Sequence, residues 1–323
     1  MKAFVLGEDG PALADVPPPQ PGPNDVLVRV RACALNRVDL MMARGHVHGG
    51  AGGAGQVLGV EWAGEVVQVG AEVPELQPGA RVMCSGAGAF AEYASVDWGR
   101  VLPMPDALDF ESAAALPVAL LTMHDAVVTN GALQPGQTVL VQGASSGVGL
   151  MALRIAKQMG ARLVIGSSTD AGRRARLGAY GADLAIDSRD PGWVDQVLAA
   201  TDGRGVDLIV DQVAGETMNQ NLRAARVRGR IVNVGRLGGQ RGELDFDLHA
   251  LRRISYIGVT FRTRSRAEVR EIARAAVADL GDAIARGALA LPIDRVFAFE
   301  ALNEALAHMR ANRHFGKIVL GPV

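Results

Sequence analysis

A glycine-rich loop between a predicted strand and a predicted helix constrains this chain most. The apolar run TVLVQ ends at Gln142, the small residues 143–149 follow, and VGLMALRIAKQMGA has a helical pattern. Small side chains let the backbone approach a pyrophosphate, and a helix N-terminus favours its charge. The strict G-x-G-x-x-G pattern is not met, because Ala144 and Ser146 occupy its first two glycine positions. A glycine-rich turn without a ligand is the alternative.

The predicted secondary structure changes near residue 112. Before it, β-branched segments such as VLVRVRACAL alternate with proline- and glycine-rich turns, which predicts a compact antiparallel, barrel-like domain. After it, strands such as RLVIGSS and VDLIVDQV alternate with helical stretches, which is typical of βαβ units in a parallel sheet. The tail returns to strand, helix and strand. Residues 46–55 are rich in glycine, so few side chains can pack there and we expect mobility.

Charge and cysteine content exclude several function classes. Lys and Arg number 33 and Asp and Glu number 34, which gives a net charge of −1 without a block of like charge. Nucleic acid is therefore not an expected partner. Cys33 and Cys84 cannot form a disulfide framework, which fits a reducing cytoplasm. The N-terminus lacks the pattern of a signal peptide and no unbroken apolar run is long enough for a membrane span, so we expect a cytoplasmic protein.

The strand after the glycine loop bears on which nicotinamide cofactor the loop would hold. An acidic residue at its end would bind the ribose hydroxyls of NAD, but Ser167 and Ser168 stand there instead. With Arg173 on the next helix, they suit the 2′-phosphate of NADPH. Asp170 lies close enough to weaken that preference. The alternative is that Arg173 and Arg174 are solvated helix surface.

A set of motifs follows in a characteristic order along almost the whole chain: ALNRVDLMMARG, LGVEWAGEVVQVG, PGARVM, GAFAEY, GASSGVG, GRGVDLIVDQVAG, GRIVNVG, VTFRTRS and HFGKIVL. Together they resemble the medium-chain dehydrogenase/reductase superfamily, and within it the zinc-independent quinone oxidoreductase and enoyl reductase branch. The resemblance implies an α/β protein with a GroES-like β-barrel-type catalytic domain at 1–115, completed by 265–323, and a Rossmann domain with a doubly wound parallel sheet at 116–264.

The resemblance also implies NADPH as cofactor and a homodimer joined edge to edge by the strand near Ser255 to Phe261. The residues that would bind NADPH are Asn36, Thr122, Gly143, Ser145, Ser146, Gly147, Val148, Ser167, Ser168, Arg173, Val213, Gly235, Arg236, Phe261, Arg262, Thr263 and Lys317.

The same resemblance predicts that no metal is bound. The catalytic zinc positions of the zinc-bearing relatives correspond here to Asn36, Val60 and Val118. Valine has no donor atom, whereas a catalytic zinc needs three protein ligands. His46 and His48 lie on the glycine-rich loop without a third donor nearby in the sequence.

Without a metal, hydride transfer to a conjugated acceptor is the expected chemistry, because its charge spreads onto an oxygen that one hydrogen-bond donor can stabilise. The tyrosine positions of the relatives hold Met41 and Val47 here. The candidate catalytic residues are Asn36, His46, His48 and Arg262, with water as the alternative proton source. The sequence thus predicts an NADPH-dependent reductase of a quinone or another activated carbonyl or alkene. The alternatives are an enoyl-CoA or enone reductase of one specific substrate, and a non-catalytic NADPH-binding protein.

Overall fold

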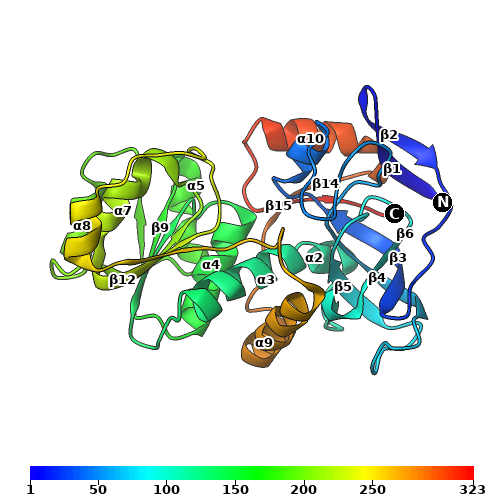
Figure 1. Ribbon diagram of the computed structural model, residues 1–323, viewed down its shortest axis with the longest axis horizontal. Coiled ribbons are helices and arrows are strands. Elements are labelled where there is room, and N and C mark those ends of the chain that lie inside the picture. The colour runs from blue at the N-terminus through cyan, green and yellow to red at the C-terminus, as the bar shows by residue number, and fades with distance from the viewer. The chain divides into compact units, whose positions relative to one another are not determined.

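The computed structural model describes all 323 residues and divides into two compact units (Figure 1). Unit 1 comprises Met1–Leu121 and Phe261–Val323, and unit 2 comprises Thr122–Thr260. The sequence placed the two boundaries at 115/116 and 264/265, and the compact units divide at 121/122 and 260/261.

Unit 1 is mostly antiparallel, as the alternating N-terminal segments predict. Its larger sheet has the order β14-β15-β3-β4-β5-β7, with β6 also paired to β3, and β1 and β2 form a separate pair. The strands are β1 Lys2–Gly7, β2 Gly10–Asp15, β3 Asp25–Ala34, β4 Glu61–Val69, β5 Arg81–Ser85, β6 Tyr93–Asp97, β7 Val101–Pro103, β14 Ile293–Phe297 and β15 Lys317–Leu320. The helices are α1 Asp39–Met42, α2 Phe110–Ala114, α3 Pro117–His124, which continues into unit 2, α9 Arg266–Ala285 and α10 Leu302–Arg310.

The C-terminal strand is part of the core of unit 1. β15 pairs antiparallel with β3, with Val319 opposite Ala34, and Figure 1 shows this red strand among the blue N-terminal ones. Ile318 and Leu320 are fully buried in the same cluster as Trp62 of β4. This pairing brings the first residue of β15, Lys317, beside the end of β3.

Unit 2 is a parallel sheet of six strands in the order β10-β9-β8-β11-β12-β13, which confirms the predicted Rossmann class. The strands are β8 Thr138–Gln142, β9 Leu163–Ser167, β10 Leu184–Ile186, β11 Val206–Asp211, β12 Ala225–Asn233 and β13 Ser255–Gly258. The helices are α4 Gly147–Gln158, α5 Ala171–Ala175, α6 Trp193–Ala200, α7 Met218–Ala224 and α8 Phe246–Arg252. From β8 the chain adds β9 and β10 on one side of β8, and then β11, β12 and β13 on its other side. Ligands of such sheets bind at the switch point between β8 and β11.

β13 is an edge strand, as the resemblance implies. The side chain of Tyr256 on it is 47% exposed. An unpaired edge of this kind favours addition of another strand, and dimerisation through it stays a prediction.

The glycine-rich stretch 46–55 packs more than its composition suggests. Ala51 exchanges two backbone hydrogen bonds with His48 and is buried in the core of unit 1. A Cβ at Gly52 would lie 2.7 Å from the carbonyl oxygen of His46 and 2.9 Å from the side chain of Met42. Part of this stretch therefore packs closely although it has few side chains, because backbone atoms fill the space; its mobility stays a prediction.

The helical stretch Phe110–Asn130, which contains α2 and α3, has the length and apolarity of a membrane span. Its most apolar window is 72% buried in the protein. Such burial is what a core helix shows.

Candidate active site

The loop after β8 is built to bring backbone N–H groups together. Gly143 has a φ of +71°, a left-handed conformation that favours glycine. Ser146 caps α4, and its Oγ accepts a hydrogen bond from the N–H of Gly149 at 3.1 Å. The N–H groups of Gly147 and Val148 in the first turn then have no acceptor in the protein. Two free donors at the positive end of a helix dipole fit the pyrophosphate of a dinucleotide.

Gly149 allows α4 to start close to this loop. A Cβ at Gly149 would lie 2.6 Å from the carbonyl oxygen of Gly143 and 2.7 Å from backbone atoms of Ala144. Backbone atoms cannot turn aside as a flexible side chain can, so only glycine fits without moving the helix.

A network of buried polar side chains holds the loop after β8 in place. Ser167 Oγ accepts from the N–H of Gly143 at 3.0 Å and donates to Gln142 Oε1 at 2.6 Å. Gln142 Nε2 donates to Asn221 Oδ1 at 3.0 Å, and Asn221 Nδ2 donates to Asp211 Oδ2 at 3.2 Å. These four side chains are 0% exposed. The hydroxyl of Ser167 is thus engaged in holding the loop, and its predicted contact with the 2′-phosphate stays a prediction.

Asp211 ends the network at a strained turn. Its Oδ1 accepts from the N–H groups of Val213 at 2.8 Å and Ala214 at 3.0 Å. Burial raises the pKa of Asp211, opposed by these two N–H groups. Ala214 has a φ of +56°, which costs a non-glycine residue free energy. The segment that follows β12 packs closely against this turn, since a Cβ at Gly235 would lie 2.7 Å from the carbonyl oxygen of Gln212.

The tip of β9 carries the second predicted subsite. Ser168 Oγ donates to Ser145 Oγ at 3.0 Å, so these two residues of the cofactor set meet. Arg174 Nη1 donates to the carbonyl oxygen of Ser168 at 2.7 Å and to Asp187 at 3.1 Å. Arg174 therefore braces the strand tip instead of lying free on the helix surface.

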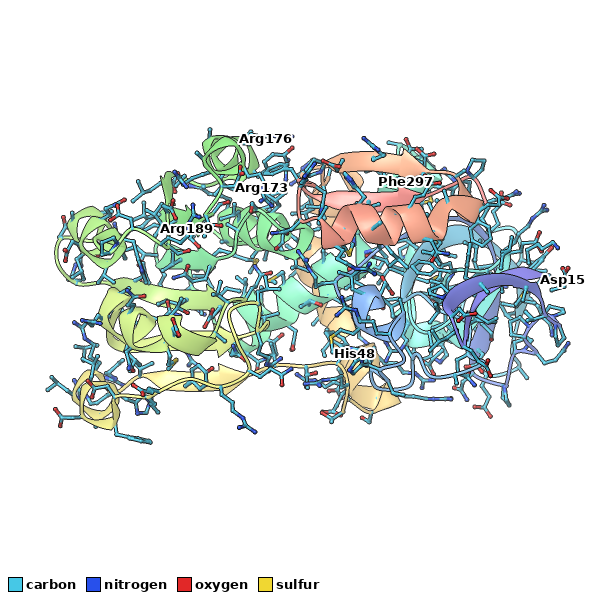
Figure 2. All side chains as sticks on the ribbon, turned by 90° about the horizontal axis from the view of Figure 1, so that it is seen from above. Asp15, His48, Arg173, Arg176, Arg189 and Phe297 are labelled. Atoms are coloured by element: carbon cyan, nitrogen blue, oxygen red, sulfur yellow. The ribbon has the colours of Figure 1, made fainter.

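Further guanidinium groups lie around this tip (Figure 2). Arg173 Nε lies 3.7 Å from Asp170 Oδ1, and Asp170 also caps α5 by accepting from the N–H of Arg173 at 2.7 Å. Arg189, from the segment after β10, donates to the carbonyl oxygen of Thr169. Sequence reasoning missed Arg189, because only the β9–β10 pairing brings it near the tip.

Unit 1 contains a compact cluster of polar groups around Asn36. Lys317 Nζ lies 2.5 Å from Glu61 Oε2 and donates to Asn36 Oδ1 at 3.0 Å. Asn36 Nδ2 donates to the same Glu61 oxygen at 2.8 Å. Glu61 Oε1 accepts from the N–H of Val118, in the first turn of α3, at 2.7 Å. The side chains of Lys317 and Glu61 are 4% and 0% exposed, whereas Asn36 is partly exposed.

Asp39 holds the backbone of the same asparagine. Its Oδ2 accepts from the N–H of Asn36 at 2.6 Å, and its Oδ1 is buried without a partner. Burial raises the pKa of Asp39 to about 7, opposed by the N–H of Asn36 and the ammonium of Lys317. A proton is therefore bound more tightly to Asp39 in the folded protein than in the unfolded chain.

The raised pKa predicts how stability depends on pH. A carboxyl whose pKa is raised from 3.8 to about 7 contributes stability below pH 4, and that stability is lost as the pH rises to about 7. Asp39→Asn cannot ionise, so between pH 4 and pH 8 its free energy of unfolding should improve relative to wild type by on the order of a few kcal/mol. Urea denaturation across this range measures it. Asp202→Asn, at an 81% exposed side chain, is the control, and equal pH profiles for Asp39→Asn and wild type would contradict the assignment.

The candidate histidines differ in their surroundings. His46 is exposed, and its Nδ1 lies 3.2 Å from the carbonyl oxygen of Met41. His48 is half-buried, and burial together with the charge of Arg262 lowers its pKa. The structure thus brings His48 and Arg262 together. The lowered pKa leaves the imidazole of His48 neutral at pH 7 and poorly suited to donate a proton.

Other residues of the predicted cofactor set make no hydrogen bond to these clusters, and their role stays a prediction. Thr122 lies in α3, and Arg236 follows β12 and donates to the carbonyl oxygen of Val234 at 3.4 Å. Phe261 and Thr263 lie between β13 and α9.

The side chains at the zinc positions do not fit a zinc ion. The amide oxygen of Asn36 accepts from Lys317 and its amide nitrogen donates to Glu61. Val118 offers only a backbone N–H, which donates to Glu61. The carboxylate of Glu61 already binds the ammonium of Lys317, which would repel a metal cation at that place. Tetrahedral zinc takes sulfur, imidazole or carboxylate ligands, and no group of three or more His, Cys, Asp and Glu side chains is placed to hold a metal.

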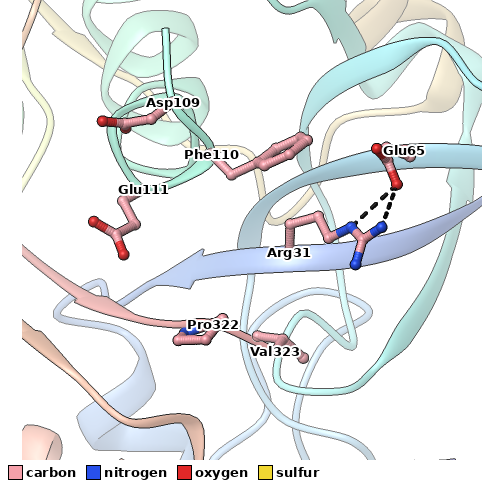
Figure 3. A pocket seen from close by; sticks show the side chains of 7 residues that line it. All are labelled: Arg31, Glu65, Asp109, Phe110, Glu111, Pro322 and Val323. Atoms are coloured by element: carbon pink, nitrogen blue, oxygen red, sulfur yellow. Dashed lines mark hydrogen bonds and ion pairs between the residues drawn. The ribbon is translucent and has the colours of Figure 1, made fainter.

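A separate hollow in unit 1, of about 490 Å³, is lined by none of the residues of the Asn36 cluster (Figure 3). Arg31 of β3 donates two hydrogen bonds to Glu65 Oε2 of the neighbouring strand β4, at 3.1 and 2.6 Å. Asp109, Phe110 and Glu111 complete much of its wall. These ordinary surface groups make it a poor candidate for the reaction site.

Comparison with known families finds two matches. Residues 22–106 match the alcohol dehydrogenase GroES-like domain, and residues 147–278 match the zinc-binding dehydrogenase family.

Individual proteins are similar over different extents. The chain is 32% identical to a quinone oxidoreductase of Pseudomonas aeruginosa over 315 residues, which covers 95% of this chain and 94% of that protein. It is 36% identical over 217 residues to a phenolphthiocerol/phthiocerol polyketide synthase of Mycobacterium tuberculosis, covering 67% of this chain but about a tenth of the synthase polypeptide. The crystal structure of Pseudomonas syringae quinone oxidoreductase superimposes with a TM-score of 0.86 at 27% identity, over 100% of both chains.

Proposed function

Because the chain belongs to the medium-chain dehydrogenase/reductase superfamily, in its quinone oxidoreductase branch, we propose that it transfers a hydride from NADPH to a quinone or a similar conjugated carbonyl, without zinc. The observation that carries the proposal is the cluster in unit 1. There the zinc positions Asn36, Val60 and Val118 hold groups unsuited to zinc, and Asn36 is hydrogen-bonded to Lys317 and Glu61.

The residues of unit 2 fit the cofactor. The free N–H groups of Gly147 and Val148 hold the pyrophosphate, and Ser168 with Arg173 binds the 2′-phosphate. When bound, NADPH supplies the hydride. Asn36 then donates a hydrogen bond to the oxygen on which negative charge develops.

Reduction of an enoyl thioester is the second candidate, and the match to polyketide synthases favours it. That reaction requires a proton at carbon. The two tyrosine positions of the relatives carry the exposed apolar side chains Met41 and Val47, and the lowered pKa of His48 keeps its imidazole neutral. The oxygens of a reduced quinone can take protons from water, so we favour quinones.

To test this, the oxidation of NADPH is followed by its absorbance, with either phenanthrenequinone or crotonyl-CoA as acceptor at equal concentration. We expect kcat/KM to be higher for the quinone. Efficient reduction of crotonyl-CoA with sluggish reduction of the quinone would select the second candidate. NADPH binding without oxidation by any acceptor would indicate a non-catalytic binding protein.

The cofactor assignment predicts a preference for NADPH over NADH. A guanidinium–phosphate hydrogen bond contributes roughly 1.5–3 kcal/mol, which is about tenfold or more in affinity. Arg173→Ala should therefore weaken NADPH binding by about that factor and leave NADH binding unchanged, as measured by fluorescence titration. Arg204→Ala, at an exposed surface pair with Asp202, is the control. Equal dissociation constants of the wild type for the two cofactors would refute the assignment.

A further inference from the structure

The strongest unexplained feature of unit 1 is that three buried ionisable groups contact one asparagine, two of them through its side chain and one through its backbone N–H. Asp39 holds the backbone of Asn36, Lys317 contacts its amide oxygen, and Glu61 contacts its amide nitrogen. Burying charged groups costs more than packing apolar ones of similar volume. A core that only needed to fill this space would be served by apolar residues.

The chemistry of the neighbours fixes which way the amide points. An ammonium can only donate hydrogen bonds, so the atom that faces Lys317 must be the amide oxygen. A carboxylate can only accept, so the atom that faces Glu61 must be the amide nitrogen. A flipped amide would place a donor against the ammonium and an acceptor against the carboxylate. The orientation of Asn36 is therefore set by charge.

This locked amide has one unused donor. Nδ2 carries two hydrogens, and the protein accepts only the one that points at Glu61. Lys317 and Glu61 are almost fully buried, whereas Asn36 is partly exposed. The remaining N–H of Asn36 is thus the one polar group of the cluster that can reach a ligand.

We propose that Lys317 and Glu61 are positioning residues that lock Asn36 as a pre-oriented hydrogen-bond donor for the carbonyl oxygen of the acceptor. This inference rests on the proposed function. The hydride brings two electrons to the conjugated acceptor, the electron pair ends on its oxygen, and a proton from water completes the reduced product. A donor already in place need not reorganise as that charge develops.

The kinetic test compares variants that keep the cluster neutral. Glu61→Gln/Lys317→Met removes both charges, so neither is left buried alone, and it frees the amide to flip. We expect kcat for phenanthrenequinone to fall about tenfold or more, and on the order of 100-fold for Asn36→Ala. NADPH affinity should change little, which would separate this role from the cofactor-binding role that the resemblance implies for Asn36 and Lys317. Adding the double substitution to Asn36→Ala should lower kcat no further, because the locked group is already absent.

Lys157→Met is the matched control. Lys157 forms a 2.6 Å ion pair with Asp183 on the surface of unit 2, where the two side chains are 33% and 38% exposed. Its kcat should equal that of wild type. Additive losses in the triple variant, or a loss confined to NADPH affinity, would overturn the proposed role, because they would indicate a structural or cofactor-binding asparagine.

A second readout does not depend on turnover. With ¹⁵N-asparagine labelling, the side-chain NH₂ signals of Asn36 are assigned by their loss in Asn36→Ala. We expect a large shift of this pair and faster hydrogen exchange in Glu61→Gln/Lys317→Met, and no change in Lys157→Met. If the wild type reduces no acceptor, the proposed function fails, but this measurement still tests whether Lys317 and Glu61 fix the orientation of the Asn36 amide. An unshifted pair in the double variant would refute the lock.

Discussion

Replacing Glu61 by leucine should lower the free energy of unfolding by about 3–5 kcal/mol, since it leaves a buried ammonium without its carboxylate. Lys317 Nζ lies 2.5 Å from Glu61, and both side chains are nearly inaccessible. The substitution also removes the acceptor of the N–H of Val118. Equilibrium urea denaturation at pH 7 measures the loss.

The same strand provides the control for this prediction. Glu65 in β4 pairs with Arg31 at 2.6 Å, but these side chains are 36% and 33% exposed (Figure 3). Glu65→Leu should cost less than about 1 kcal/mol, because water screens such a pair. Adding Lys317→Met to Glu61→Leu should recover much of the stability, since an apolar pair needs no solvation. Equal losses of unfolding free energy for the two glutamate variants would show that burial does not increase the contribution of the Lys317–Glu61 ion pair to stability.

Gly149→Ala should weaken NADPH binding by about 100-fold, which corresponds to about 2.7 kcal/mol. The new Cβ would lie 2.6 Å from the carbonyl oxygen of Gly143, so α4 must move away from the loop and carry the N–H groups of Gly147 and Val148 with it. Overpacking of this kind also costs about 1–3 kcal/mol of stability. Fluorescence titration and urea denaturation measure the two effects.

A second helical glycine should respond with the opposite sign. A Cβ at Gly281 in α9 would meet only Val277, at an ordinary 3.8 Å. Gly281→Ala should therefore stabilise the protein by roughly 0.5–1 kcal/mol through helix propensity, and leave NADPH binding unchanged. Unaltered binding in Gly149→Ala would mean that the loop tolerates a displaced helix.

The surroundings of the candidate proton donors favour water as the proton source. His48 is kept neutral by burial and by Arg262, and the exposed imidazole of His46 lies against a backbone carbonyl. Neither is arranged as the catalytic donor that an enoyl reduction needs. We therefore expect the rate of quinone reduction to survive replacement of either histidine.

Local sequence patterns predicted the fold class and the glycine-rich loop that we propose binds the pyrophosphate. Alternation of strands and helices depends on neighbouring residues, so the parallel sheet of unit 2 could be recognised before its strands were paired. The glycine loop is equally local, because Ser146, Gly147, Val148 and Gly149 act within one turn of α4. The roles of Gly149 and of the helix N-terminus followed from side-chain size and helix geometry alone.

Tertiary structure alone decided the contacts between distant segments. Lys317 lies 281 positions from Asn36 and meets it only because β15 pairs with β3. Pairing of β9 with β8 turns Ser167 inward onto Gln142, and pairing of β10 with β9 brings Arg189 to the strand tip. Periodicity indicates which face of a strand is buried but not which strand lies beside it. The sequence by itself determined the kind of units and the glycine-rich loop between β8 and α4, whereas strand pairing decided which charges surround Asn36.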